Sequence, residues 1–264
     1  MDKTVVIITG ANSGIGRATA TALLKEHCIV YDFSRRDLSV DEVNHIKVDV
    51  TDEDNVNSAV REVYEKEGRI NVVINCAGFG ISGAVEFTAL EDAKAQFDVN
   101  FFGMVNVNKA VIPYMRKNGS GRIVNISSVA AVAHIPFQTF YSASKAAIES
   151  YTCALGNELK PFNITVTAIQ PGDICTEFTK ARKKTFDGDD VYNGRISKSV
   201  AGMERDEQKG MKPETAGSYI AKIAMKSKVK PIYAIGVSYK LVCILCKIFP
   251  CNFRNWVIGL LYAK

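Results

Sequence analysis

The sequence predicts an α/β fold: a single doubly wound domain in which about seven parallel strands form a sheet with helices on both faces. Short apolar, β-branched segments alternate with amphipathic segments of helical periodicity from end to end. The strand segments are largely continuous apolar runs, as in sheets that are covered on both sides. Successive parallel strands are joined by right-handed crossovers, so this alternation predicts a parallel sheet. A chain of 264 residues is long enough to bury the core of one such domain.

The elements are expected in a regular order along residues 1–264. Strands are predicted at 5–9, 29–33, 46–48, 72–75, 122–127, 165–169 and 232–234. Helices are predicted at 14–26, 54–68, 89–117 and 141–159. Residues 174–212 are polar, charged and weakly periodic, and a loop of that length in a compact domain is usually functional. We therefore expect 177–212 to form a substrate loop or lid.

Composition and charge exclude several classes of function. The apolar fraction is 47% and the charged fraction is 23%, as in ordinary globular proteins. The net charge of +5 comes without a concentrated basic stretch, so no nucleic-acid partner is expected. Seven scattered cysteines, and an N-terminal segment without the long apolar region of a secretion signal, predict free thiols and a cytoplasmic location. Cys243 and Cys246 form a CxxC without further ligands at metal spacing, so no metal is predicted.

A glycine-rich turn follows the first strand. The segment "TGANSGIG", residues 9–16, leads from that strand into a helix. Glycines let the backbone approach a pyrophosphate, and the free N–H groups and dipole of a helix N-terminus favour its charge. The alternative is a tight turn without a ligand. The place of this segment directly after a buried strand favours the anion site.

A tyrosine and a lysine lie four residues apart at the start of a helix. In "YSASK", Tyr141 and Lys145 fall on one helix face, where the ammonium favours the phenolate. A free tyrosine has a pKa of about 10, so such a charge would move it toward the working pH. The alternative is that Tyr141 packs and Lys145 is solvated.

Five segments together resemble the short-chain dehydrogenase/reductase family. "TGANSGIG", "NCAG", "NISS", "YSASK" and "PGDICT" occur in the order and spacing of that family, within residues 3–234. The resemblance is weaker in 177–212 and in the C-terminal tail. It implies a Rossmann-like fold and hydride transfer between a nicotinamide and a secondary alcohol or ketone, of the hydroxysteroid-dehydrogenase type. It also implies a homodimer or homotetramer.

The resemblance implies four catalytic residues. Tyr141 would be the acid/base, and Lys145 together with an oxidised nicotinamide ring would lower its pKa. The second serine of "NISS", Ser128, lies thirteen residues before the tyrosine and would hold the substrate oxygen. Asn100 would hold a water that links Lys145 to solvent.

The same resemblance indicates NADP(H). The family's acid at the end of the second strand is replaced by Ser34, and Arg35 and Arg36 could bind a 2′-phosphate. The alternative is that the two arginines are merely solvated; Asp32 lies too early in the strand to serve as that acid. The implied cofactor set is Gly10, Asn12, Ser13, Gly14, Ile15, Gly16, Ser34, Arg35, Arg36, Asp49, Val50, Asn75, Ala77, Gly78, Tyr141, Lys145, Pro171, Gly172, Ile174 and Thr176.

The variable segments predict a hydrophobic substrate. The loop "VAAVAHIPFQTF" is apolar, and its His134 is expected beside Ser128 and Tyr141 at the site entrance. The segment "EFTKARKK" is basic and could meet an anionic tail, although such a run is usually a solvated face. A hydroxysteroid or bile acid is the expected substrate. The alternatives are a 3-oxoacyl-thioester reductase of lipid synthesis and a non-catalytic NADP(H)-binding regulator.

An apolar extension, residues 236–264, follows the last strand. Lys240, Lys247 and Arg254 are seven residues apart and would share one side of a helix, and Pro250 would divide it in two. These charges leave no stretch long enough to span a membrane. The pattern fits peripheral membrane contact, a partner subunit or the substrate entrance. We expect packing within the protein.

Overall fold

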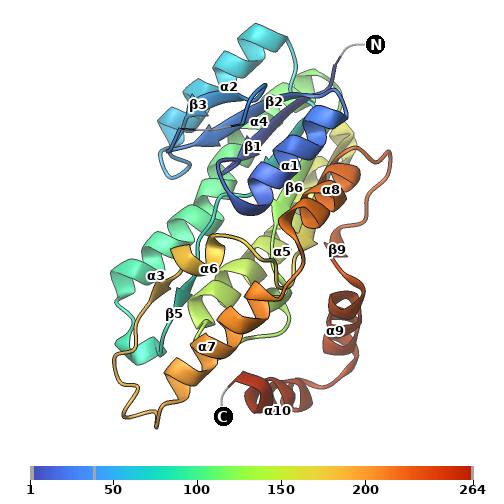
Figure 1. Ribbon diagram of the computed structural model, residues 1–264. Helices are drawn as coiled ribbons and strands as arrows, with labels where there is room; N and C mark the ends of the chain where they lie inside the picture. Colours follow the sequence, from blue (N-terminus) through green and yellow to red (C-terminus); the bar gives the residue numbers. More distant parts are fainter. Residues whose placement is uncertain (1–2, 38–39, 263–264) are drawn as a thin grey trace.

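Seven parallel strands form one central sheet, as predicted. The structure is a computed structural model that describes residues 3–37 and 40–262. The strands lie in the order β3-β2-β1-β4-β6-β7-β9 (Figure 1). Their bounds are Val5–Thr9 for β1, Ile29–Ser34 for β2, Asn44–Lys47 for β3, Val72–Asn75 for β4, Gly121–Ile126 for β6, Ile164–Gln170 for β7 and Ile232–Ala234 for β9.

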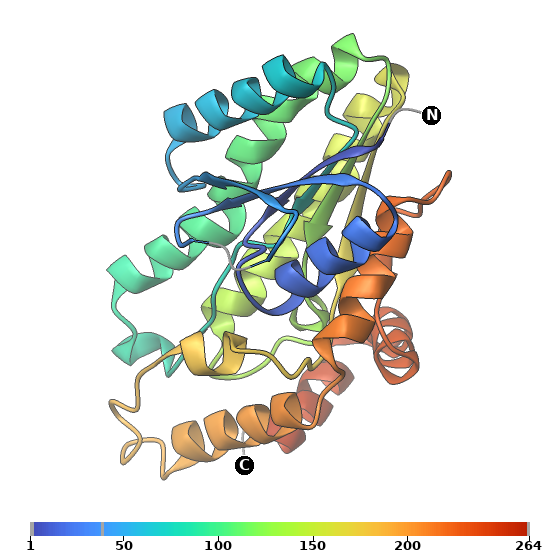
Figure 2. The same cartoon turned by 45° about the horizontal axis from the view of Figure 1, so that its top comes forward.

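Helices cover both faces of this sheet (Figures 1 and 2). On one face lie α1 (Gly14–Lys25) and α8 (Pro213–Ala224), whose buried side chains form one core with the strands. On the other lie α2 (Glu53–Glu67), α4 (Met104–Lys117) and α5 (Thr139–Leu159), which form a second core. The helix α3 (Leu90–Phe97) continues through a π-helical turn, Asp98–Gly103, into α4.

The direction of chain winding reverses between β1 and β4. The chain runs outward from β1 through β2 to β3 and then returns to the other side of β1. Ligands of open α/β sheets bind beyond the carboxyl ends of the strands at such a point. The fold therefore places the turn after β1 and the segment after β4 at one site.

The polar stretch 174–212 differs from the expected loop. It contains α6 (Phe178–Ala181), the short strand β8 (Lys183–Lys184) paired with β5 (Ile81–Ser82), and α7 (Arg195–Gln208). The helix α7 buries Ile196, Val200 and Met203 in a small core with Phe137. The rest of the α7 surface is polar because it faces solvent. The helical periodicity of its few apolar residues is therefore weak in the sequence.

The C-terminal extension forms two helices. They are α9 (Val237–Ile248) and α10 (Cys251–Tyr262), and the chain turns at Pro250 as expected. Figure 1 shows α10 beside α7, which it contacts. Within residues 3–37 and 40–262, no helix is long and apolar enough to cross a membrane. Residues 263–264 of the predicted extension lie outside the described part.

Candidate active site

The turn after β1 leaves the N-terminus of α1 open. A Cβ on Gly16 would lie 2.3 Å from the carbonyl oxygen of Gly10, so only glycine allows this tight fold. The N-cap residue Ser13 makes no side-chain hydrogen bond to the helix, so its first N–H groups are left for a ligand. Buried Asp32 accepts a hydrogen bond from the Ala11 amide at 2.8 Å and fixes the turn against β2. This geometry fits the pyrophosphate of a dinucleotide.

A cavity of about 1510 Å³ starts at this turn and extends to α9 and α10. It crosses the carboxyl ends of the central strands, where the predicted segments after β4, β6 and β7 meet. Every residue of the predicted cofactor set lines this cavity except Asn75.

The side chain of Asn75 lies behind the cavity. Its Nδ2 donates to Asn108 Oδ1 at 2.8 Å and to Asn125 Oδ1 at 2.9 Å, and Asn125 Nδ2 donates to Thr152 Oγ1 at 3.0 Å. These contacts tie β4 and β6 to α4 and α5. The expected contact of the "NCAG" backbone with the cofactor stays a prediction. The Asn75 side chain takes part in this buried network, and the next residue, Cys76, lines the cavity.

No acid occupies the last position of β2. Ser34 is buried and its hydroxyl donates to Asp32 Oδ2, so it faces inward. The exposed Arg35 and Arg36 line the cavity, as do Arg17 and the acid Asp37. The ion pair of Arg35 Nη1 with Asp49 Oδ2 is long, at 3.8 Å, and 68% of the Arg35 side chain is exposed. Its guanidinium can therefore turn to a phosphate at small cost.

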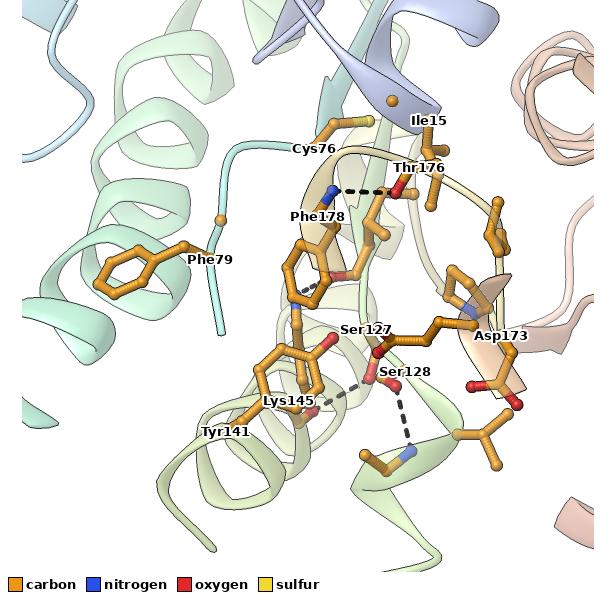
Figure 3. A pocket seen from close by; sticks show the side chains of 18 of the residues that line it. Ile15, Cys76, Phe79, Ser127, Ser128, Tyr141, Lys145, Asp173, Thr176 and Phe178 are labelled. Atoms are coloured by element: carbon orange, nitrogen blue, oxygen red, sulfur yellow. Dashed lines mark hydrogen bonds between the residues drawn. The ribbon is translucent and has the colours of Figure 1, made fainter. Parts of the chain in front are cut away.

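Tyr141, Lys145 and Ser128 converge at the centre of the cavity (Figure 3). The first turns of α5 carry Tyr141 and Lys145, and the Lys145 Nζ lies 5.6 Å from the centre of the Tyr141 ring. Ser128 follows β6, where its Oγ accepts from the Ala130 amide at 3.1 Å and shares a hydrogen bond with Tyr141. The neighbouring Ser127 is buried and donates to Glu149 Oε1 at 2.8 Å. Of the two serines, Ser128 faces the tyrosine.

The two titratable groups of α5 that line the cavity, Tyr141 and Lys145, are both shielded from water. Burial raises the pKa of Tyr141 to about 12, although the Ser128 hydrogen bond and the charge of Arg182 oppose the shift. Burial lowers the pKa of Lys145 to about 8. At neutral pH, Tyr141 is therefore a proton donor and Lys145 is largely charged.

The pKa of Tyr141 is raised here, and the lowering expected from Lys145 together with an oxidised nicotinamide stays a prediction. The Lys145 ammonium donates at 2.8 Å to the carbonyl oxygen of Ile126 rather than to the phenol. Removal of the phenol from water disfavours the phenolate more than the neighbouring charges favour it.

Asn100 lies behind the cavity, in the π-helical turn between α3 and α4. Its Nδ2 donates to the Phe79 carbonyl at 3.0 Å, and its Oδ1 accepts from the Phe79 amide at 2.9 Å. A Cβ on Gly78 would lie 3.0 Å from Asn100 Oδ1 and 3.8 Å from Lys145 Nζ. The Asn100 amide and the Lys145 ammonium therefore both lie beside Gly78. Such π-helical turns are frequent at functional sites.

The substrate side differs from the expectation at His134. That side chain is exposed and does not line the cavity, whereas its neighbours Ala133 and Ile135 do. The loop turns the imidazole outward, so its predicted substrate contact is corrected.

Sequence reasoning missed several residues on this side. The Phe178 ring lies 5.7 Å from the Tyr141 ring, and the acids Asp173 and Glu207 line the cavity. The far wall consists of apolar side chains from α9 and α10: Val242, Leu245, Phe249, Phe253, Val257 and Leu261. The apolar composition of residues 236–264 is the sequence feature that indicated this wall. Nothing in the sequence distinguished Asp173 or Glu207 from surface acids.

The Asp173 and Glu207 carboxylates have partners within the protein. The Tyr239 hydroxyl of α9 donates to Asp173, and buried Arg182 pairs with Glu207. The charges of both acids raise the pKa of Tyr141, which places them near the phenol. Close to Tyr141, this side of the cavity therefore carries the Asp173 carboxylate and the Arg182–Glu207 ion pair, and farther away it is apolar.

Comparison with known proteins gives consistent matches. The short chain dehydrogenase family profile matches residues 4–187. A 3-ketodihydrosphingosine reductase from Bacteroides thetaiotaomicron is 39% identical over 100% of this chain and 99% of its own. A 3-oxoacyl-[acyl-carrier-protein] reductase from Thermotoga maritima is 39% identical over 68% of this chain and 78% of its own.

A solved structure has the same architecture. ElxO with NADP bound superposes with a TM-score of 0.76 at 26% identity, over 90% of this chain and 99% of its own. The profile match, the full-length relative and the shared fold agree with the geometry of the cavity. The chain is a member of the short-chain dehydrogenase/reductase family of oxidoreductases.

Proposed function

We propose that this protein is an NADPH-dependent reductase of long-chain amino ketones of the 3-ketodihydrosphingosine class. The observation that carries the proposal is the composition of the cavity. Tyr141 lies between the Asp173 carboxylate and an apolar wall, in a chain that matches a 3-ketodihydrosphingosine reductase from end to end.

The residues around the first turn fit NADPH. The open N-terminus of α1 suits the pyrophosphate, and the arginines Arg17, Arg35 and Arg36 outnumber the acids Asp37 and Asp49 where a 2′-phosphate would lie. A relative of the same fold binds NADP. When bound, NADPH supplies the hydride that reaches the carbonyl carbon.

The residues of α5 and β6 supply the proton. Ser128 donates a hydrogen bond to the ketone oxygen, and Tyr141 transfers its hydroxyl proton to that oxygen as the new C–H bond forms. The Lys145 ammonium stabilises the negative charge left on Tyr141. Asn100, which holds the segment beside Lys145, supports the return of a proton from solvent. The ketone becomes a secondary alcohol and NADPH becomes NADP⁺.

The two sides of the cavity match the two sides of such a ketone. In 3-ketodihydrosphingosine the carbonyl lies between a carbon that bears an amine and a long alkyl chain. The ammonium would lie beside Asp173, since Glu207 already pairs with Arg182, and the alkyl chain would lie along α9 and α10. The hydroxysteroid or bile acid expected from the sequence gains no support from the relatives above.

The test is NADPH consumption on a panel of ketones. The panel holds 3-ketodihydrosphingosine, its analogue without the amine, an acetoacetyl thioester and a 3-ketosteroid. We expect turnover of the amino ketone and a loss of at least about a hundred-fold in Tyr141→Phe, with NADPH binding retained. The Asp173→Asn variant should lower kcat/KM for the amino ketone but not for the analogue.

Other outcomes would contradict the proposal. Turnover of the steroid or thioester alone would assign another substrate. Tight NADPH binding without turnover of any ketone would instead support a non-catalytic NADP(H)-binding regulator.

A second candidate is reduction of 3-oxoacyl thioesters on a carrier. One relative is a 3-oxoacyl-[acyl-carrier-protein] reductase, and the basic Lys180 and Lys183 line the cavity where an acidic carrier would approach. The covering α9–α10 wall and the Asp173 carboxylate favour the amino ketone.

A further inference from the structure

The helices α9 and α10 are apolar on two sides. One side forms the cavity wall. The other is exposed: Ile248 is 70% exposed and Trp256 is 61% exposed, and neither lines the cavity. We call this exposed set the outer face of α9–α10; it consists of Val237, Leu241, Ile244, Ile248, Trp256 and Leu260. So many large apolar side chains on adjacent helices are characteristic of an interaction surface.

The charge of this surface has one sign. Residues 236–262 contain Lys240, Lys247 and Arg254 and no aspartate or glutamate. Lys240 and Lys247 are exposed beside the outer face. A two-fold contact with a second copy would bring these like charges together, whereas an anionic lipid surface would attract them.

The cavity opens at the same place. Val242, Leu245, Phe249, Phe253 and Leu261 line the cavity and are also exposed, so its apolar wall continues to the protein surface on α9 and α10. Each helix has 12 residues, which gives a length of about 18 Å. Such helices are too short to span a bilayer but long enough to lie in its interface.

We propose that the outer face of α9–α10 docks on an anionic lipid bilayer and opens the apolar end of the cavity to the membrane. Apolar side chains enter the acyl boundary while the two lysines remain at the headgroups. An apolar substrate then passes from lipid to cavity without crossing water. This surface assignment does not depend on which ketone is reduced.

Trp256 reports docking without any mutation. It is the only tryptophan of the chain. We expect its emission to shift to the blue when vesicles of phosphatidylcholine with phosphatidylglycerol are added to the full-length protein. The protein should float with these vesicles in a density gradient, and more weakly with phosphatidylcholine alone. An unchanged emission and no flotation would overturn the proposal.

Variants locate the surface. Ile248→Glu with Trp256→Glu should weaken vesicle binding by more than about ten-fold, because two large apolar side chains no longer enter the lipid. The matched control is Leu90→Glu with Val191→Glu, which changes exposed apolar residues elsewhere by the same charge and should bind as the wild type does. Lys240→Gln and Lys247→Gln should each lose roughly five-fold, on anionic vesicles only.

Two further readouts complete the test. Turnover of a short, water-soluble ketone should be unchanged in the Ile248→Glu, Trp256→Glu variant, which shows that it is folded. Equal vesicle binding by this variant and the wild type would overturn the proposal. So would light scattering in which the wild type is a larger oligomer than the variant and neither floats, because the outer face would then bind a second copy.

Discussion

Lys145 determines how the proposed reduction depends on pH. Its pKa is lowered by burial to about 8, whereas the pKa of Tyr141 is raised to about 12. Below pH about 8 the ammonium stabilises the charge that grows on Tyr141 as its proton leaves, and above it the neutral amine does not. Tyr141 itself remains protonated over this range. The rate of reduction should therefore be constant near neutral pH and fall toward about ten-fold per pH unit above pH about 8.

The measurement is kcat against pH for the wild type and two variants. Lys145→Arg keeps its positive charge, so its kcat should not fall near pH 8. Lys145→Met should be slow at every pH. A wild-type rate that stays constant to pH about 10 would contradict the role given to Lys145.

Arg35 should determine the preference for NADPH. Arg35→Asp removes a charge-assisted hydrogen bond worth about 1.5–3 kcal/mol, so kcat/KM for NADPH should fall about ten- to hundred-fold. The value for NADH should stay the same or rise. Lys47→Asp is the control, since this exposed lysine of the neighbouring strand makes the same change in net charge without lining the cavity. Equal losses with both cofactors would show that Arg35 does not contact the 2′-phosphate.

Single residues were predictable where the chain pattern fixes their place. The Gly10–Gly16 turn, Ser128, Tyr141 and Lys145 follow strand ends or share a helix face, and all of them line one cavity. Side-chain direction in loops was not predictable, so His134 was expected at the entrance. The buried hydrogen bonds of the Asn75 side chain were not predictable, because its partners Asn108 and Asn125 come from other elements.

Among the helices, α1 and α8 pack unusually closely. A Cβ on Gly217 of α8 would lie 2.4 Å from the carbonyl carbon of Ala18 in α1. Gly217→Ala must push the helices apart and should lower the free energy of unfolding by about 1–3 kcal/mol. Urea unfolding measures this change.

Gly202 of α7 is the matched control. A Cβ there meets nothing within 4 Å, so Gly202→Ala should stabilise the helix by about 0.5–1 kcal/mol. Two substitutions with the same chemistry should thus have opposite signs. A stabilising Gly217→Ala would show that α1 and α8 have room to spare.

Elements were predictable when their own sequence carries a buried face. Each of the seven strands was found within a few residues, most of them because their apolar runs are nearly continuous. The helix α7 was not, because only a narrow stripe around Ile196, Val200 and Met203 is buried. The paired strands β5 and β8 have two residues each, too few to show any period. The π-helical turn that holds Asn100 has the periodicity of an ordinary helix in sequence.

At the scale of the molecule, the cavity is lined by two parts of the chain that differ in how far their sequence predicts their structure. The half between the glycine turn and Tyr141 follows the family pattern and could be predicted. The half formed by α7, α9 and α10 depends on how the polar segment and the tail fold back, which no local pattern encodes. The homodimer or homotetramer implied by the family resemblance stays a prediction, which light scattering on dilute protein would test.

The most direct measurement is kcat/KM for NADPH-dependent reduction of 2-amino-3-ketones with increasing alkyl length. If α9 and α10 bind the chain beside Tyr141, each added methylene contributes up to about 0.8 kcal/mol, or roughly four-fold. We predict a steep rise with length that levels off once the wall is covered, and a loss of at least about a hundred-fold at every length in Tyr141→Phe. Rates that do not depend on chain length, or reduction by Tyr141→Phe at close to the wild-type rate, would contradict the account.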